Sequence, residues 1–174
     1  AFSGGKEIRG PNDTGLLLGR RDLIEAARMH QNPNYGVGRP MKVSKEQIVG
    51  LVTALGLFVA RDFRAQRESW ESIVNYWVEQ FSGYESVKAE RVMPDPSKHE
   101  YSAQCWPKAR LTLDDKALGI SATRVVELLR LGEPSIYAPS HENIITLSPQ
   151  CLQAGEERIV AQRLRDILRL SGKA

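Results

Sequence analysis

The longest apolar pattern in the sequence follows Ser44 and ends near Ser82. Ser44, with Gln47 three residues later, forms a capping-box pattern, which predicts the first turn of a helix. Apolar side chains then recur at helical spacing, at Ile48, Leu51, Val52, Leu55, Phe58, Val59, Phe63, Trp70, Ile73, Val74, Trp77 and Phe81. One helix over this range would be about 57 Å long at the α-helical rise of 1.5 Å per residue. Because no small compact domain holds a helix of that length, the pattern predicts a helix over 44–82 that joins two bodies or lines an oligomer interface.

The segment before this helix, residues 1–43, is punctuated by glycine and proline. Its opening "AF" is typical of the end of a strand, so we expect the sequence to begin inside a fold. The run "TGLLLGR" (14–20) lies between glycines and predicts a short buried strand. Asp22 is then expected to cap a helix over "LIEAARMH" (23–30). The stretch "NPNYGVGRPMKV" (32–43) holds two prolines and two glycines, which predicts a loop.

Beyond Gly83 the pattern changes to short strands that alternate with helices. Four segments have the composition of half-buried strands, and these are 84–93, 103–113, 134–139 and 142–149. Two segments predict helices, 121–132 with Ser and Gly at its ends and 154–170 with an apolar side. Residues 83–174 are therefore expected to form a small α+β domain.

Composition restricts the classes of function. Hydrophobic residues make up 41% and charged residues 26%, which suits a globular domain. The net charge of +3, from 24 basic and 21 acidic residues, is too small to favour nucleic-acid binding. Two cysteines, Cys105 and Cys151, with no CxxC pair give neither a disulfide framework nor a metal site. With no spanning apolar run and no leader pattern, we expect a cytoplasmic protein without a membrane partner.

The glycine cluster "SGGKEIRGP" (3–11) is the strongest pointer to chemistry. Ordered glycine marks a sharp bend or a close backbone approach, so Lys6 stands in an unusual place. A nucleotide-binding P-loop is excluded, because Glu7 follows Lys6 where that motif needs Ser or Thr. A lysine in a surface turn is the alternative that these residues alone leave open.

The wider pattern resembles pyridoxal-phosphate enzymes of fold type I, the aspartate-aminotransferase fold. More narrowly, it resembles the selenocysteine-synthase-like group, and the D-glucosaminate-6-phosphate ammonia-lyase relatives most of all. The resemblance rests on "SGGKEIRGP", on "NPNYGVGRPMKVSKEQIVGLVTAL" and, more loosely, on "GEPSIYAPSHENIITLSPQCLQAGEERIVAQRLRDIL". It implies an α/β fold in which residues 1–43 end the cofactor-binding large domain, 44–82 form the linking helix and 83–174 form the small domain. The chain then looks like the carboxy-terminal half of such an enzyme.

The resemblance also implies roles for residues near the glycine cluster. Lys6 matches the lysine that forms a Schiff base with pyridoxal 5'-phosphate, which would require a buried amine that is neutral when it reacts. Ser3 matches a hydroxyl that touches the cofactor phosphate, although it equally suits a serine that satisfies the backbone at a strand end. Arg9 is expected to lower the basicity of Lys6 or to bind a phosphate.

Three further residues are implied as substrate-binding. Arg39 and Lys42 lie in a loop that the resemblance places near the active site, where they would bind a phosphate or carboxylate. His141 is expected to reach the site from the small domain. For each of the three, a plain surface position is the alternative. Relatives commonly carry a basic residue where Ala138 and Pro139 stand here, which puts carboxylate capture from that strand in doubt.

The resemblance implies a lyase that releases ammonia from a phosphorylated amino sugar acid or related amino acid. We expect a small-molecule amine substrate and a homodimer or higher homo-oligomer. A selenium or sulfur transferase acting on aminoacyl-tRNA is the alternative enzyme, and the mild net charge argues against it. A non-catalytic fragment that docks on a partner chain is the third possibility.

Overall fold

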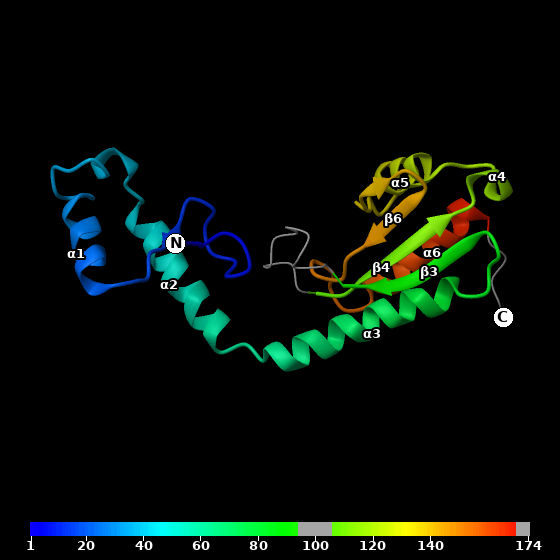
Figure 1. Ribbon diagram of the computed structural model, residues 1–174, viewed down its shortest axis with the longest axis horizontal. Helices are drawn as coiled ribbons and strands as arrows, with labels where there is room; N and C mark the ends of the chain where they lie inside the picture. The colour runs from blue at the N-terminus through cyan, green and yellow to red at the C-terminus, as the bar shows by residue number, and fades with distance from the viewer. Residues whose placement is uncertain (94–105, 170–174) are drawn as a thin grey trace. The chain divides into compact units, whose positions relative to one another are not determined.

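The computed structural model describes residues 1–93 and 106–169. The chain divides into two compact units, Ala1–Asp62 and Phe63–Ala174. Cys105 lies outside the described residues, as do the other two residues, 103 and 104, at the beginning of the strand predicted over 103–113. Figure 1 shows the helices and strands of each unit with their labels.

The first unit opens with two short antiparallel strands. β1 (Phe2–Ser3) pairs with β2 (Gly15–Leu16), so the strand end predicted at the start of the chain is confirmed. The buried strand predicted over 14–20 is wrong in extent and burial. Only two of its residues are in β2, and Leu17 and Leu18 are 53% and 67% exposed. A ladder of two residue pairs with no second layer over these leucines cannot bury them.

Helix α1 (Arg21–Met29) follows, and its start differs from the prediction. Arg20 occupies the N-cap position without a side-chain hydrogen bond, and Asp22 lies inside the first turn. There the Asp22 carboxylate accepts hydrogen bonds from Arg20 at 3.1 and 2.5 Å. The Arg20 guanidinium lowers the pKa of Asp22. Asp22 therefore stabilises the helix start as a first-turn acid rather than as a cap.

The predicted capping box is confirmed at the start of α2 (Lys45–Val59). The Gln47 N–H donates to the Ser44 hydroxyl at 3.2 Å, and the Ser44 N–H donates to the Gln47 side chain at 2.8 Å. The single helix expected over 44–82 is wrong, because α3 (Phe63–Phe81) is a separate helix. Asp62 occupies the position directly before α3, where Asp is more favourable than it is inside a helix. The two compact units meet in sequence at this interruption.

The second unit is a four-stranded antiparallel sheet covered by helices. The strands are β3 (Val87–Val92), β4 (Lys108–Leu113), β5 (Ser140–His141) and β6 (Ile144–Leu147), in the order β3-β4-β6-β5. The helices besides α3 are α4 (Asp115–Leu118), α5 (Ala122–Leu131) and α6 (Glu156–Leu168). The structure thus confirms a mixed helix-and-sheet architecture after residue 83. The strand predicted at 134–139 is absent. The strand β5 begins at Ser140, directly after that range.

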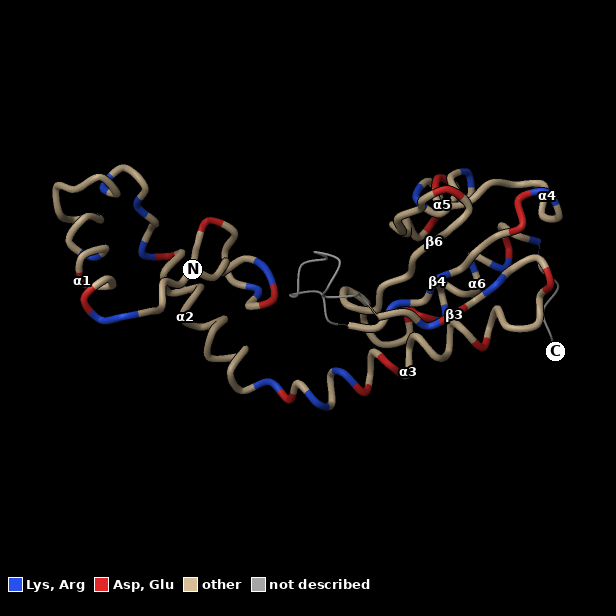
Figure 2. The backbone as a smooth tube through the Cα atoms, viewed as in Figure 1, with Lys and Arg blue, Asp and Glu red and all other residues tan. Residues whose placement is uncertain are grey.

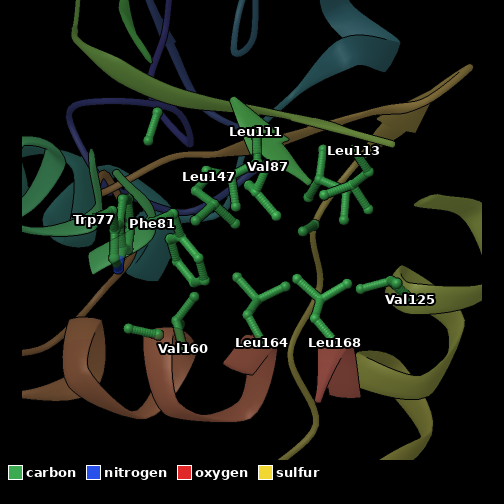
Figure 3. Close-up of a cluster of buried hydrophobic side chains, with 14 of the residues drawn as sticks. Trp77, Phe81, Val87, Leu111, Leu113, Val125, Leu147, Val160, Leu164 and Leu168 are labelled. Atoms are coloured by element: carbon green, nitrogen blue, oxygen red, sulfur yellow. The ribbon is translucent and has the colours of Figure 1, made fainter. Parts of the chain in front are cut away.

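The core of this unit lies between the sheet and helices α3, α5 and α6. In Figure 3, side chains of the sheet such as Leu111 and Leu147 point toward Val160, Leu164 and Leu168 of α6. Trp77 of α3 is 1% exposed, and its indole N–H donates to the Glu157 carbonyl at 2.9 Å. Trp77 is therefore a core residue of this unit.

None of the helices within residues 1–93 and 106–169 is both long and apolar enough to cross a membrane. Over those same residues, His, Cys, Asp and Glu side chains nowhere gather in a group of three that would hold a metal ion.

Candidate active site

Lys6 lies on a turn whose backbone is closed by hydrogen bonds. The Gly4 N–H donates to the Thr14 carbonyl at 2.8 Å, and the Gly10 N–H donates to the Gly4 carbonyl at 2.8 Å. Inside this loop the Arg9 N–H donates to the Lys6 carbonyl at 2.9 Å, and Arg9 has a left-handed φ of 61°. These backbone hydrogen bonds fix the conformation of the turn that carries Lys6.

The glycines before Lys6 are required by close packing. A Cβ at Gly4 would lie 2.1 Å from Thr14 Oγ1 and 2.7 Å from Leu51 Cδ1. A Cβ at Gly5 would lie 2.5 Å from Asn12 Oδ1 and 2.6 Å from Asn12 Cα. No real Cβ sits so close to another heavy atom. The absence of side chains at these two glycines therefore lets the turn pack against Asn12 and Thr14 and against Leu51 of α2.

Helix α2 holds the turn along its length, as the blue loop beside α2 shows in Figure 1. Leu51 is 7% exposed and is the one buried hydrophobic residue found in the first unit. Near the start of the helix, the Gln47 amide donates to the Asp13 carboxylate at 3.2 Å. After its end, Arg61 pairs with Glu7 at 3.1 Å. The turn is thus attached at both ends of α2, which gives Lys6 a defined backbone.

The side chain of Lys6 is exposed, so the expected buried amine is not found in this chain. Its turn presents the residue outward, and the described residues put nothing over it. Within those residues, the Lys6 amine makes no ion pair or hydrogen bond. Ser3 at the end of β1 and Arg9 are exposed as well. Ser3, Lys6 and Arg9 are therefore carried by one turn, each with its side chain accessible.

The loop that carries Arg39 is equally ordered by short backbone contacts. The Gly38 N–H donates to the His30 carbonyl at 2.8 Å, and Gln31 forms a parallel bridge with Gly38. A Cβ at Gly36 would lie 2.4 Å from His30 Cα. A 3-10 helix, η1 (Arg39–Met41), then follows inside the segment predicted to be a loop.

Arg39 and Lys42, both predicted to bind substrate, lie in this loop, and their role in substrate binding stays a prediction. They line an open hollow of about 520 Å³ together with Asn32, Tyr35, Gly36 and Pro40. The Arg39 guanidinium carbon lies 4.3 Å from the centroid of the Tyr35 ring, and Nη1 donates to the Pro33 carbonyl. Sequence reasoning missed Tyr35. The available signal was an aromatic residue four positions before an arginine in a glycine-rich loop.

The second unit holds the remaining candidate. His141 lies in β5, where it pairs with Ile144, and its side chain is exposed. A role in substrate binding stays a prediction for His141. Ala138, which stands where relatives commonly carry a basic residue, is 7% exposed. Its side chain belongs to the core cluster of this unit, so that position contributes packing rather than a charge.

These features are those of a segment of an enzyme, and comparisons with known proteins support that class. No protein-family model matches the sequence. The resemblance to the ammonia-lyase relatives, inferred from the lysine and "GRPMKVSKE" motifs, is confirmed by both sequence and structure. The relatives described next carry the names of enzymes.

D-glucosaminate-6-phosphate ammonia lyase of Salmonella typhimurium (strain 14028s / SGSC 2262) is 30% identical over 170 residues, which is 95% of this chain and 42% of that protein. A 5'-C-glycyluridine monooxygenase-decarboxylase of a Streptomyces species is 28% identical over 170 residues, which is 96% of this chain and 40% of that protein. A solved D-glucosaminate-6-phosphate ammonia-lyase superposes with a TM-score of 0.67 at 27% identity, over 95% of this chain and 42% of its own. The chain therefore spans about two fifths of the length of the curated relatives it matches.

Proposed function

We propose that this chain is part of a pyridoxal-phosphate-dependent lyase that releases ammonia from a phosphorylated amino sugar acid or a related amino acid. The observation that carries the proposal is Lys6, an accessible amine that pairs with none of the described residues, on a turn fixed against α2 in a chain similar to an ammonia lyase over 95% of its length. A covalent role for a lysine needs a free amine on a defined backbone, and Lys6 meets both requirements.

The residues on the turn fit a phosphorylated aldehyde cofactor. The donor set consists of one primary amine, one hydroxyl at Ser3 and one guanidinium at Arg9. These groups are suited to a covalent bond with an aldehyde and to hydrogen bonds with a phosphate. Pyridoxal phosphate held at Lys6 would supply an electron sink that acidifies the C–H bond beside the substrate amine.

The chain's own residues then divide the remaining work. Lys6 would remove the proton from the carbon beside the substrate amine. Ser3 and Arg9 would hold the cofactor phosphate, and Arg39 with Lys42 would bind an anionic group of the substrate. Loss of a hydroxyl and hydrolysis then release ammonia and leave a keto acid.

Burial of Lys6 depends on polypeptide beyond the described residues. Relatives are more than twice as long as the segment they share with this chain. In the fold type I arrangement that we propose, residues outside this chain cover the Lys6 turn and add an acidic partner for the cofactor ring. A homodimer or a higher homo-oligomer would contribute to the same closure, because exclusion of water makes a lysine amine nucleophilic.

The test is covalent capture of the cofactor at Lys6. The chain, together with any polypeptide that copurifies, is mixed with pyridoxal phosphate, reduced with borohydride, digested and analysed by mass spectrometry. We expect the cofactor mass on the peptide that contains Lys6, with a visible absorption band that Lys6→Arg abolishes. The matched control is Lys116→Arg, an exposed lysine of α4. Equal labelling of many lysines, unchanged in Lys6→Arg, would overturn the assignment.

The substrate is tested in the same preparation. Release of ammonia from D-glucosaminate 6-phosphate supports the proposal. Conversion of 5'-C-glycyluridine with release of carbon dioxide, the reaction type that the Streptomyces relative's name gives, would replace it. Salt-sensitive binding of tRNA would instead support the selenium or sulfur transferase.

A non-catalytic docking role is favoured by one observation. The first unit exposes many large apolar side chains, a feature of interaction surfaces. On α2 these are Ile48, Val49, Val52, Leu57 and Val59. Intact mass spectrometry separates the two functions. A partner chain whose presence restores cofactor capture at Lys6 supports the lyase, whereas a stable complex without cofactor capture supports docking alone.

A further inference from the structure

The Lys6 turn has few charged groups around it within the first unit. The charged side chains of residues 1–19 are Lys6, Glu7, Arg9 and Asp13. Helix α2, which packs against this stretch, carries no charged residue from Gln47 to Val59. Figure 2 shows that part of α2 in tan, beside a loop that has both blue and red positions. The next charged residue along the chain is Arg61, directly after the end of the helix.

Glu7 places a carboxylate beside Lys6. The Arg9 N–H donates to the Lys6 carbonyl at 2.9 Å, so residues 6–9 form one tight turn that contains both side chains. A neighbouring carboxylate attracts the proton of a lysine and favours its ammonium form. Because an ammonium is not a nucleophile, an uncompensated Glu7 would slow any reaction of the Lys6 amine.

The structure pairs the Glu7 carboxylate with Arg61 instead. Arg61 Nη1 lies 3.1 Å from Glu7 Oε1. Arg61 is itself held at the end of α2, because its backbone N–H donates to the Phe58 carbonyl at 3.2 Å and its guanidinium carbon lies 5.5 Å from the centroid of the Phe58 ring. Lys6 meanwhile pairs with none of the described residues. The acid beside Lys6 is thus bound by a cation that comes from a different part of the unit.

The turn is closed without this ion pair. Its backbone is joined by the hydrogen bonds of Gly4 and Gly10, and Gly4 packs against Leu51. The Asp13 carboxylate, the other acid of the stretch, accepts a hydrogen bond from the Gln47 amide. A partly exposed ion pair adds little stability to a turn that is already attached. The same pair cancels much of the field of the Glu7 carboxylate, since an equal and opposite charge lies next to it.

We infer that Arg61 is a positioning residue for Lys6, which binds the Glu7 carboxylate and thereby keeps the Lys6 amine available as a nucleophile. Arg61 does not touch the reacting atoms, and it acts through Glu7. For a bond between Lys6 and a cofactor aldehyde the inference rests on the proposed function, whereas for the reactivity of the amine toward a neutral reagent it does not.

The test is acetylation of the 174-residue chain with acetic anhydride, a neutral reagent that reacts with unprotonated amines. The acetyl group is transferred to the Lys6 nitrogen, and acetate and a proton are released. Mass spectrometry gives the rate at Lys6 over a pH series, relative to Lys116 of α4 in the same sample. Arg61→Ala should slow the reaction of Lys6 about two- to fivefold near neutral pH, the effect of one uncompensated charge several Å away in a solvated site. An unchanged rate would overturn the inference.

A double variant separates the charge of Glu7 from the structure of the turn. Glu7→Gln/Arg61→Ala also lacks the ion pair, so the turn is loosened as in Arg61→Ala, but no carboxylate lies beside Lys6. Its rate should return to within a factor of two of the parent rate. A double variant as slow as Arg61→Ala would show that the pair acts only through the shape of the turn, which overturns the inference. The Leu51 methyl signals in NMR spectra serve as the folding control, because Leu51 reports packing of the first unit.

Two single variants complete the comparison. Arg61→Lys keeps a cation at this position and should retain most of the parent rate at Lys6. Arg64→Ala removes an arginine three residues further along the chain, where it pairs with Glu68 at 3.0 Å. This control should leave the acetylation of Lys6 within a factor of two of the parent. Equal slowing in Arg64→Ala and Arg61→Ala would show a general effect of net charge and overturn the specific role of Arg61.

The same variants are then treated with pyridoxal phosphate and borohydride, which separates this inference from the proposed function. Cofactor capture that falls in Arg61→Ala and returns in the double variant extends the role of Arg61 to the cofactor bond. If acetylation follows that pattern while no variant captures cofactor at Lys6, the lyase proposal fails and the role of Arg61 stands. If Lys6 captures cofactor while acetylation is equal in all variants, the role of Arg61 is overturned and the lyase proposal stands.

Discussion

Glu7 and Arg61 join the two ends of the first unit, with 3.1 Å between Oε1 and Nη1. Their side chains are 37% and 21% exposed, so solvent screens the pair only in part. Glu7 follows Lys6 directly, and Arg61 follows the last turn of α2. The ion pair therefore ties the Lys6 turn to the end of α2. The start of α2 is already attached to the same segment through the hydrogen bond between Gln47 and Asp13.

Removal of this pair should loosen the turn more than it destabilises the protein. We expect Arg61→Ala to lower the free energy of unfolding of the first unit by no more than about 1 kcal/mol, the upper range for partly exposed pairs. NMR relaxation should at the same time show increased motion of the Lys6 and Glu7 amides. Arg64→Ala, which breaks the exposed pair with Glu68, is the control and should leave those amides unchanged. An unaltered Lys6 amide in Arg61→Ala would contradict the linkage.

Gly4 should tolerate no side chain. Its Cβ would lie 2.1 Å from Thr14 Oγ1 and 2.7 Å from Leu51 Cδ1, so Gly4→Ala forces the turn away from α2. We expect a loss of about 1–3 kcal/mol in the free energy of unfolding, typical of overpacking. Gly19→Ala is the matched control, because a Cβ there has no neighbour within 4 Å. Denaturant unfolding followed at the first unit measures both, and similar effects in the two variants would be inconsistent with the packing described.

Local signals in the sequence predicted element ends well. The Ser44 capping box is present, and Ser121 and Gly132 bound α5 as expected, with the Arg124 N–H donating to the Ser121 hydroxyl at 3.3 Å. Such capping interactions join residues only three or four positions apart, so the local sequence is enough to predict them. The separation of α2 from α3 escaped prediction for the opposite reason. Apolar residues continue on both sides of Ala60–Asp62, and periodicity alone does not record a short interruption.

The candidate site was predictable in residue type but not in arrangement. The glycines beside Lys6 indicated a close approach, yet its partners Thr14 and Leu51 are distant in sequence and carry no signal of their own. Arg39 and Lys42 were named from the sequence as residue types, whereas the contact between Arg39 and the Tyr35 ring depends on how residues 35–39 fold. The expected burial of Lys6 failed for a physical reason. Burial depends on neighbouring polypeptide, and the matched relatives are more than twice as long as the shared segment.

The second unit should fold around its own core. Leu164 of α6 is fully buried, and Leu164→Ala should lower the free energy of unfolding by about 2–5 kcal/mol through lost burial and a residual cavity. Ile159 on the same helix is 42% exposed, so Ile159→Ala is the control and should cost much less. Urea unfolding, followed by the fluorescence of Trp77 in this core, measures the difference. Equal losses in the two variants would contradict the burial pattern of α6.

The pair formed by Glu71 of α3 and Arg91 of β3 should give the second unit a pH-dependent contribution. Arg91 donates two hydrogen bonds to the Glu71 carboxylate, at 2.7 and 2.5 Å, and thereby lowers the pKa of Glu71. Because the folded-state pKa lies below the unfolded one, the stabilisation is present above the unfolded value of 4.5 and is lost as the pH falls through the folded value. The side chains are 32% and 40% exposed, which limits the contribution to about 1 kcal/mol or less.

Glu71→Gln is the variant that measures this contribution. Its free energy of unfolding should be lower than that of the parent chain near neutral pH, and the two values should converge in acid below the folded-state pKa of Glu71. Glu79→Gln replaces an exposed glutamate of the same helix and is the control, so its free energy of unfolding should stay close to that of the parent chain. Urea unfolding over a pH series provides the measurement. A difference between parent and Glu71→Gln that stays constant into acid would mean that the lost carboxylate acts through packing rather than through its charge.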